Sequence, residues 1–287
     1  MALMNEQLEA AASAAPLGSM QYNGLLGDYI GGVFGTAIAA ITFLVVLAAW
    51  WTTRRNDSKT KIYEVFAEML RTHEEIISSI ELAGVKGREA FSIILSEFSF
   101  IYKTTRNLVP SDTIWSMHQR IDVAYTYTYY GPQLQTQRIL KQHDPAMLKL
   151  VGDAISKKQQ SNANSKNARH RQRLFKGHQN RLSHYFRNLF AAYSFIESSN
   201  LSEKEKRSLS KVLRAKLSNY EQALLLLNTM AHLGEEWKHS GLLAKYKPIK
   251  NVPKNFFSFD EANFILKNEF PYIVFEWEAP LSNAVRS

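Results

Sequence analysis

The segment SHYFRNLF, Ser183–Phe190, places a histidine, an arginine and an asparagine close together on a predicted helix. Side chains three and four positions apart lie on one side of a helix, so His184, Arg187 and Asn188 share a face. A histidine can act as a general base, and an arginine can bind a phosphate or a carboxylate. The same residue types are also typical of a polar cluster between packed helices, where a buried charge needs a partner.

A second helical segment, LRAKLSNYEQALLLLN, carries groups that could complement the first. Its only acidic residue, Glu221, comes just before an apolar run. We expect Arg187 or His184 to pair with Glu221 across a helical hairpin. A structural polar cluster is the preferred interpretation, and a catalytic or ligand-binding site is the alternative. The candidate set is His184, Tyr185, Arg187, Asn188, Arg214, Asn219, Tyr220 and Glu221.

A strongly basic segment precedes this hairpin, because no acidic residue occurs between Asp153 and Glu197. Its charge could neutralise nucleic-acid phosphates, lie against anionic lipid, or form a solvated face. The basic patch comprises Lys157, Lys158, Lys166, Arg169, Arg171, Arg173, Lys176 and Arg181. Arg173 and His178 also fit the spacing Arg-x(4–6)-His of a family of helical ribonucleases called HEPN. In that alternative the histidine is the general base and the arginine stabilises the phosphorane.

Other chemistry has little support in the sequence. The 287 residues contain no phosphate loop, no H-E-x-x-H and no G-x-S-x-G. The lack of cysteine excludes disulfide frameworks and thiolate zinc sites. We therefore expect no metal and no cofactor, and the sequence favours a protein that is not an enzyme. The net charge of +9 suggests an acidic partner such as nucleic acid or anionic lipid.

One stretch predicts a membrane anchor, because residues 29–53 carry no charge. About twenty apolar helical residues cross the hydrocarbon core, and Ile30–Trp51 is long enough. Basic residues follow at Arg54 and Arg55, whereas residues 1–28 contain no lysine or arginine. This asymmetry predicts a single-pass helix with the N-terminus outside and the C-terminal part in the cytoplasm. A buried core helix is the alternative.

Small residues recur every four positions along this span. Gly31, Gly35 and Ala39 would let two helices approach closely in lipid. The spacing predicts self-association, although glycine and alanine are also common in spanning helices.

The rest of the chain has helical periodicity, so the predicted fold class is all-α. Helices are expected at residues 61–82, 88–107, 181–198 and 202–233. A further helix is expected to start at Pro110 and Ser111-Asp112 and to end near Gly131. A strand is the alternative at residues 125–130, and a short strand could form at residues 272–275. The expected divisions are an outer segment 1–28, a transmembrane helix 29–53, a first cytoplasmic helical part 54–156, a basic linker 157–173, and a helical hairpin with a C-terminal tail 174–287.

HYFRNLF followed by LRAKLSNYEQALLLLN resembles the paired signature of the phage abortive infection (AbiC-like) proteins of bacteria. Three further segments are similar to parts of that family in the same order, namely GDYIGGVFG, KGREAF and SGLLAKYKPIKNVP. Members often carry two N-terminal spans, whereas this chain shows one. The resemblance implies antiviral defence without a settled reaction. It also implies that the eight candidate residues form the polar core or site of the family.

Together these observations predict a membrane-anchored effector of antiphage defence that oligomerises and disturbs the bacterial inner membrane. The alternatives are an anchored HEPN-type ribonuclease and a non-enzymatic adaptor that binds nucleic acid or a partner protein. The expected partners are inner-membrane lipid, further copies of the chain, a nucleic acid or phage-derived trigger, and a protein encoded nearby.

Overall fold

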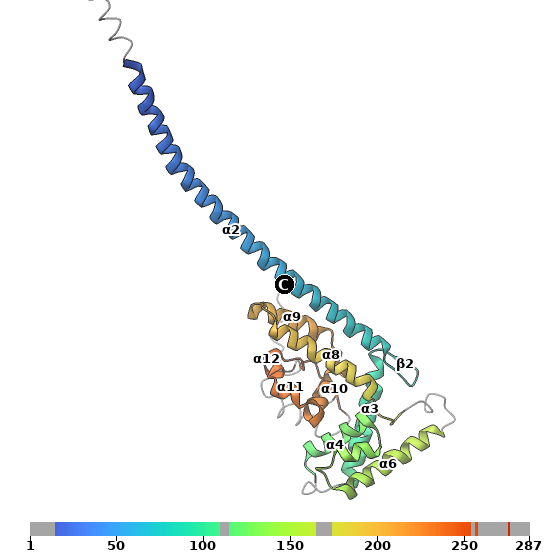
Figure 1. Ribbon diagram of the computed structural model, residues 1–287. Helices are drawn as coiled ribbons and strands as arrows, with labels where there is room; N and C mark the ends of the chain where they lie inside the picture. The colour runs from blue at the N-terminus through green and yellow to red at the C-terminus, as the bar shows by residue number, and fades with distance from the viewer. Residues whose placement is uncertain (1–14, 110–114, 165–173, 254–255, 258–274, 276–287) are drawn as a thin grey trace, which may run out of the picture. The chain divides into compact units, whose positions relative to one another are not determined.

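The computed structural model describes residues 15–109, 115–164, 174–253, 256–257 and 275. Within these ranges, side chains are described from residue 41 onward, with the exception of residues 55–56. The chain divides into two units, residues 1–61 and 62–287. The described residues are mostly helical (Figure 1), which confirms the predicted all-α class.

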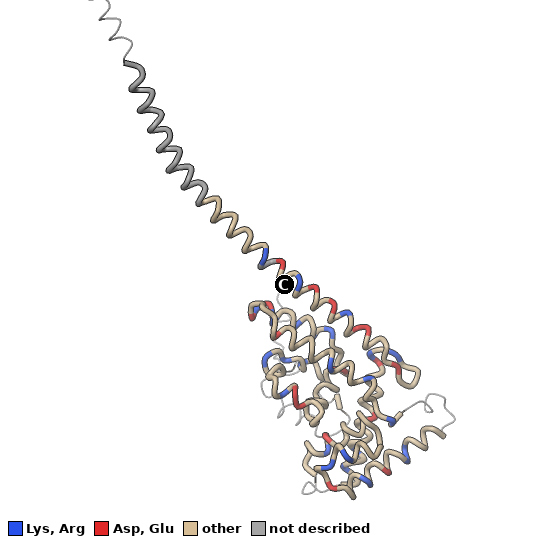
Figure 2. The backbone as a smooth tube through the Cα atoms, in the orientation of Figure 1, with Lys and Arg blue, Asp and Glu red and all other residues tan. Residues whose placement is uncertain are grey.

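Helix α2, Ala15–Ser79, contains the predicted membrane segment and most of the helix expected after it. The large apolar side chains between Ile41 and Trp51 are open to solvent, from 49% exposed at Leu47 to 65% at Trp51, whereas Phe66 and Ile77 further along the helix are buried. After Trp51, charged residues of both signs follow along the helix from Arg54 onward (Figure 2). Among the helical residues that the structure describes, none forms a helix with both the length and the apolarity needed to traverse a bilayer. The side chains of residues 29–40, with the packing positions Gly31, Gly35 and Ala39, lie outside the described part.

Helix α3, Glu89–Leu108, is central to the second unit. It follows a short antiparallel pair, β1 at Glu81–Leu82 and β2 at Val85–Lys86, where AGVKG interrupts the helical pattern. It contacts α4, α6 and α10. The remaining elements are α4 (Met117–Tyr130), α5 (Leu134–Ile139), α6 (Pro145–Ala163), α8 (Gln179–Ser198), α9 (Glu203–Ala215), α10 (Asn219–Met230), η1 (His232–Gly234), α11 (Glu235–His239) and α12 (Leu242–Tyr246).

The alternating YTYTYY segment, residues 125–130, belongs to α4. The preferred helical interpretation is confirmed and the strand alternative is wrong, because Tyr125–Thr128 are buried without alternation inside a continuous helix. Ser116 caps α4 with Gln119 in a capping box. The predicted helix start at residues 110–112 and the strand residues 272–274 lie outside the described residues, and α6 includes residues 157–163 of the predicted linker.

The helix predicted over residues 202–233 is divided in the structure, so that prediction is wrong in its continuity. Ser202 and Glu205 form the predicted capping box at the start of α9. A second capping box, Ser218 with Glu221, starts α10 after a break. The two segments have different surroundings, since α10 is buried from Glu221 to Met230 whereas most of α9 is open to solvent. The break lets each segment begin with its own cap.

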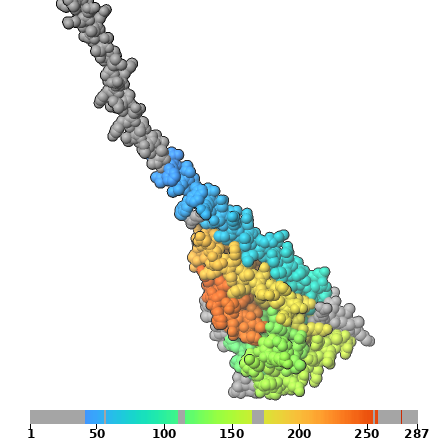
Figure 3. All heavy atoms as spheres, in the orientation of Figure 1, coloured from blue at the N-terminus to red at the C-terminus, as the bar shows by residue number. Residues whose placement is uncertain are grey.

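Helix α8 confirms the helix predicted over 181–198 and begins two residues earlier. Its buried side chains recur at the three- and four-residue spacing of an amphipathic helix. They are Leu182, Tyr185, Phe186, Leu189, Ala192, Tyr193 and Ile196. In Figure 3, α8 in yellow adjoins the orange segment of α10 to α12 over one continuous surface of the second unit.

Two glycines let the end of α4 meet the start of α8. Gly131 has φ +80° and Gly177 has φ +88°, in the left-handed region that favours glycine. A Cβ on Gly177 would lie 2.4 Å from the carbonyl carbon of Tyr130. The His178 N–H donates to the carbonyl of Tyr129 at 2.8 Å. This backbone junction therefore fixes the position at which α8 starts.

Replacing Gly177 with alanine should destabilise the protein far more than the same change at Gly84. Gly84 also has a positive φ, +77°, but an added Cβ there meets nothing within 4 Å. We expect about 1 kcal/mol for Gly84→Ala from backbone strain alone, and about 3 kcal/mol for Gly177→Ala because the clash adds to it. Urea unfolding monitored by circular dichroism measures both. Equal losses would show that the close approach contributes nothing.

Candidate functional site

Glu221 is the centre of a buried polar cluster. Its side chain is 0% exposed, and three different elements supply its partners. The Tyr185 hydroxyl donates to Oε1 at 3.1 Å, and the Arg88 Nε donates to Oε2 at 3.2 Å. The same Oε2 accepts the Ser218 N–H at 2.8 Å as part of the capping box. One carboxylate thus joins α8, α10 and the residue that precedes α3.

Arg88 connects this cluster to α2. Its Nη2 donates to Glu74 at 2.9 Å and to the carbonyl of Lys216 at 3.0 Å. The hydrogen bond with Glu74 is the main reason that the pKa of Arg88 is raised. Because Arg88 is about one-third exposed, water screens its charge, whereas the carboxylate of Glu221 is fully enclosed.

His73 of α2 lies beside the same carboxylate. Its Nε2 is 3.8 Å from Glu221 Oε1, and neither ring nitrogen has a hydrogen-bond partner among the described residues. Burial lowers the pKa of His73, so the ring is held neutral near pH 7. Burial and the adjacent Glu221 carboxylate raise the pKa of Tyr185 well above its usual value, so its hydroxyl remains a donor.

The predicted pairing of Arg187 or His184 with Glu221 is wrong. Both side chains are on the exposed side of α8, and Arg187 donates from Nε to the carbonyl of Ser183 at 3.1 Å. Tyr185 points inward instead and takes the place expected for them. The error has a physical reason: α8 is apolar on several sides, so its pattern did not determine which polar residue faces inward.

The other candidate residues occupy separate places. Asn188 is half-buried near His73 and acts, against the effect of burial, to raise the pKa of that histidine. Arg214 donates to the carbonyl of Lys247 at 3.1 Å. Asn219 is exposed, and the ring of Tyr220 packs against Phe256 at 5.2 Å. Of the eight candidates, the structure brings only Tyr185 and Glu221 into direct hydrogen-bond contact, among the described residues.

His178, the proposed general base of the ribonuclease alternative, is 0% exposed. Its Nε2 is 3.1 Å from Glu97, which also accepts the Phe175 N–H at 2.8 Å. Glu97 is buried as well, so this is an internal pair that fixes the segment before α8. Its predicted partner Arg173 lies outside the described residues. A histidine enclosed in this way cannot reach an RNA phosphate without rearrangement of the fold.

The basic patch is only partly described. Lys157 and Lys176 are exposed, Lys158 lies over the Phe100 ring at 5.5 Å, and Arg181 donates to the carbonyl of Glu81 at 3.1 Å. The other members lie outside the described residues, namely Lys166, Arg169, Arg171 and Arg173.

Asp122 forms a second polar cluster that sequence reasoning missed. Its Oδ1 is 2.6 Å from His232 Nδ1, and its Oδ2 is 3.2 Å from His143 Nε2. Burial acts to raise the pKa of Asp122, but the hydrogen bonds from His143 and His232 outweigh it and hold the pKa well below the usual range. The hydrogen bond with Asp122 raises the pKa of His232. The sequence feature that could have indicated this cluster was the presence of an aspartate within the aromatic helix α4. Among the described residues, no group of three or more such side chains is arranged to hold a metal ion.

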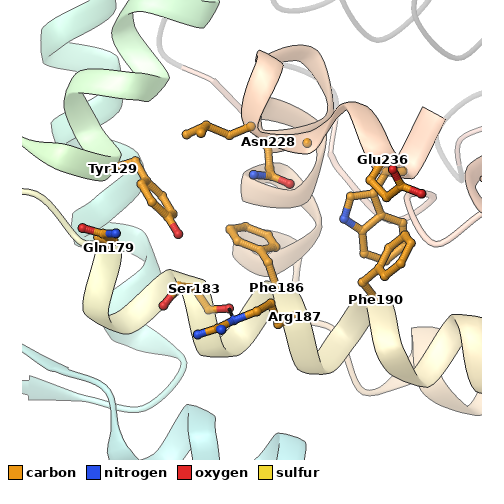
Figure 4. A pocket seen from close by; sticks show the side chains of 11 residues that line it. Tyr129, Gln179, Ser183, Phe186, Arg187, Phe190, Asn228 and Glu236 are labelled. Atoms are coloured by element: carbon orange, nitrogen blue, oxygen red, sulfur yellow. Dashed lines mark hydrogen bonds between the residues drawn. The ribbon is translucent and has the colours of Figure 1, made fainter. Parts of the chain in front are cut away.

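A pocket of about 530 Å³ opens between α8, α10 and α11 (Figure 4). Aromatic rings form much of its wall, and Phe190 meets Trp237 edge to face at 5.1 Å. The Arg187 guanidinium extends along α8 beside Ser183. The lining residues are Tyr129, Gln179, Ser183, Phe186, Arg187, Phe190, Asn228, Leu233, Gly234, Glu236 and Trp237.

Removing the buried carboxylate should destabilise the fold strongly. Glu221→Ala removes the acceptor of the Tyr185 hydroxyl, one of the acceptors of Arg88 and half of the capping box of α10, so we expect a loss of about 3 kcal/mol. Tyr185→Phe removes one hydrogen bond and should cost about 1 kcal/mol. Urea unfolding of the full chain measures both variants.

The matched control is Glu68→Gln, which breaks the exposed 2.6 Å pair with Arg71. Because water screens that pair, no measurable change is expected. If Glu221→Ala were as stable as Glu68→Gln, the buried cluster would have no role in holding the helices together.

One of three comparisons with known proteins found a match, and it covers Tyr185, Ser218 and Glu221 of the buried cluster and most of the pocket. No curated protein and no solved structure matches the chain. Residues 177–257, from the start of α8 to beyond α12, match the family model described as "Putative phage abortive infection protein". This match over α8 to α12 confirms the resemblance carried by HYFRNLF and LRAKLSNYEQALLLLN and supports an AbiC-like family.

Proposed function

We propose that this protein is a membrane-anchored effector of bacterial antiphage defence of the abortive-infection type. The observation that carries the proposal is the family match over residues 177–257. That segment includes Tyr185 and Glu221 and supplies ten of the eleven residues that line the pocket. The family description names abortive infection, in which an infected cell stops growing before phage progeny mature.

Anchoring in the bacterial inner membrane is the second part of the proposal. It is supported by the uncharged stretch 29–53 and by the exposed apolar side chains that α2 presents between Ile41 and Trp51. Exposed side chains of this kind favour lipid as their surroundings. Arg54 lies over the Trp50 ring at 5.2 Å, a pairing of aromatic and basic residues typical of the cytoplasmic interface. The N-terminus would then face outward and the second unit would face the cytoplasm.

The effector would act by self-association and disturbance of the inner membrane. The four-residue spacing of Gly31, Gly35 and Ala39 supports close helix packing in lipid. The ribonuclease alternative loses support, because His178 is enclosed and bound to Glu97. The adaptor alternative rests on the basic patch, of which four members lie outside the described residues.

Cells that carry the gene should be protected from phage in liquid culture at a low ratio of phage to cells and should collapse at a high ratio. Gly35→Leu should abolish protection, because its bulk blocks helix packing. Ala37→Leu places the same side chain about 200° away around the helix and should retain protection.

Absence of protection at either ratio, across a broad panel of phages, would contradict the defence role. Full protection by Gly35→Leu would contradict self-association through this face and leave the defence role standing.

Membrane attachment should depend on the centre of the apolar stretch. Ile41→Arg places a charge there, at a cost of about 3 kcal/mol for insertion, so the protein should leave the carbonate-washed membrane fraction. Thr53→Arg places the same charge at the end of the stretch and should leave the protein in that fraction. Recovery of the unaltered chain in the supernatant would contradict anchoring.

A further inference from the structure

The pocket between α8, α10 and α11 joins features that suit one class of ligand. Its volume of about 530 Å³ lies within the range of small-molecule sites. Phe186 and Trp237 are largely buried, at 8% and 3% exposed, so their rings form a fixed wall rather than a mobile rim. A planar aromatic ligand would gain its contact area mainly at Phe190, which is half-buried, and the two buried rings behind it would need no ordering.

A cation lines the same cavity with its charge unmatched. Arg187 forms no ion pair with any residue that the structure describes, and its one hydrogen bond, from Nε to Ser183, leaves the Nη donors available. The Nε bond fixes the direction of the guanidinium along α8, as Figure 4 shows. A guanidinium with two open donors on one side is suited to a phosphate oxygen pair.

Acceptors line the cavity as well. Glu236 lines the pocket and also makes no ion pair within the described part of the chain. In Figure 4 its carboxylate lies beyond Phe190, on the side away from Tyr129 and Gln179. The Asn228 side chain is 4% exposed and is directed into the cavity near Phe186. A carboxylate and an amide oxygen recognise an amino group on a ring by accepting hydrogen bonds from its N–H groups.

We propose that this pocket binds a nucleoside monophosphate that carries an exocyclic amine, with its phosphate on Arg187, its base against Phe186, Phe190 and Trp237, and its amino group towards Glu236. The aromatic wall supplies stacking, which is tolerant of base identity. The choice among bases comes from the acceptor on Glu236, because a site built around such a hydrogen bond discriminates against a ligand that lacks the donor. This inference goes beyond the defence role and is tested independently of it, on purified protein.

The test is isothermal titration of the purified full chain with adenosine monophosphate, adenosine, inosine monophosphate and inorganic phosphate. Adenosine monophosphate should bind most tightly. Adenosine, which lacks the phosphate, and inosine monophosphate, which lacks the amine, should each bind about tenfold more weakly. Failure of adenosine monophosphate to bind would overturn the proposal, as would binding no tighter than that of inorganic phosphate.

Two exposed substitutions separate the contacts. Arg187→Gln should weaken adenosine monophosphate about tenfold and leave adenosine unchanged. Glu236→Gln should reduce the preference over inosine monophosphate. Lys204→Gln and Glu64→Gln remove the same charges from exposed positions outside the pocket and should bind as the unaltered chain does. Equal affinities for Arg187→Gln and Lys204→Gln would overturn the assignment.

Discussion

The second unit is organised around a carboxylate that has been withdrawn from water. Desolvation of Glu221 is unfavourable by several kcal/mol unless donors replace the lost water. The replacement comes from the Tyr185 hydroxyl, the Arg88 guanidinium and the Ser218 backbone N–H. These groups are far apart in sequence, so their helices can satisfy the carboxylate only when all of them are docked. The cluster therefore specifies the arrangement of the helices in addition to stabilising it.

The same carboxylate also determines how α2 is held. Arg88 contacts Glu221 and Glu74 at once, and His73 faces the cluster from the same helix. A neutral histidine is compatible with this site, because a second unscreened charge would need its own donors or acceptors.

The charged groups of the pocket, unlike Glu221, are not withdrawn from water. These groups, Arg187 and Glu236, remain at the solvent edge, where a ligand can reach them.

Local signals in the sequence predicted much of the fold. Helical periodicity located α3 and α8, and the Ser202–Glu205 capping box located the start of α9. Ser218 and Glu221 have the spacing of another capping box, but the apolar run that follows hid the break before α10. Periodicity reports only which residues of one helix share a face, and it carries no information on distant partners.

The candidate site shows the same limit. The resemblance pointed to Tyr185 and Glu221, which the structure joins, but the expected partners Arg187 and His184 face outward. The partner that the structure supplies, Arg88, lies in KGREAF, a segment already similar to the family. His73 and Asp122 gave weaker signals, because a lone charged or titratable residue in a helix does not indicate its partner. Their contacts arise only from tertiary packing.

The shared carboxylate has a consequence for how this fold can diverge. Positions 88 and 221 hold opposite charges, and only the carboxylate is enclosed, so loss of Arg88 alone leaves an uncompensated charge inside the protein. Drift at these positions should therefore be concerted: a homologue with a neutral side chain at 221 is free to lose the arginine, and one without the arginine is expected to have lost the carboxylate. Glu74 shares the arginine but is about one-third exposed, so it should vary more freely than the enclosed Glu221. Covariation of positions 88 and 221 among homologues would then identify those that retain the buried cluster. It would be independent of the selection that acts on the residues around the pocket.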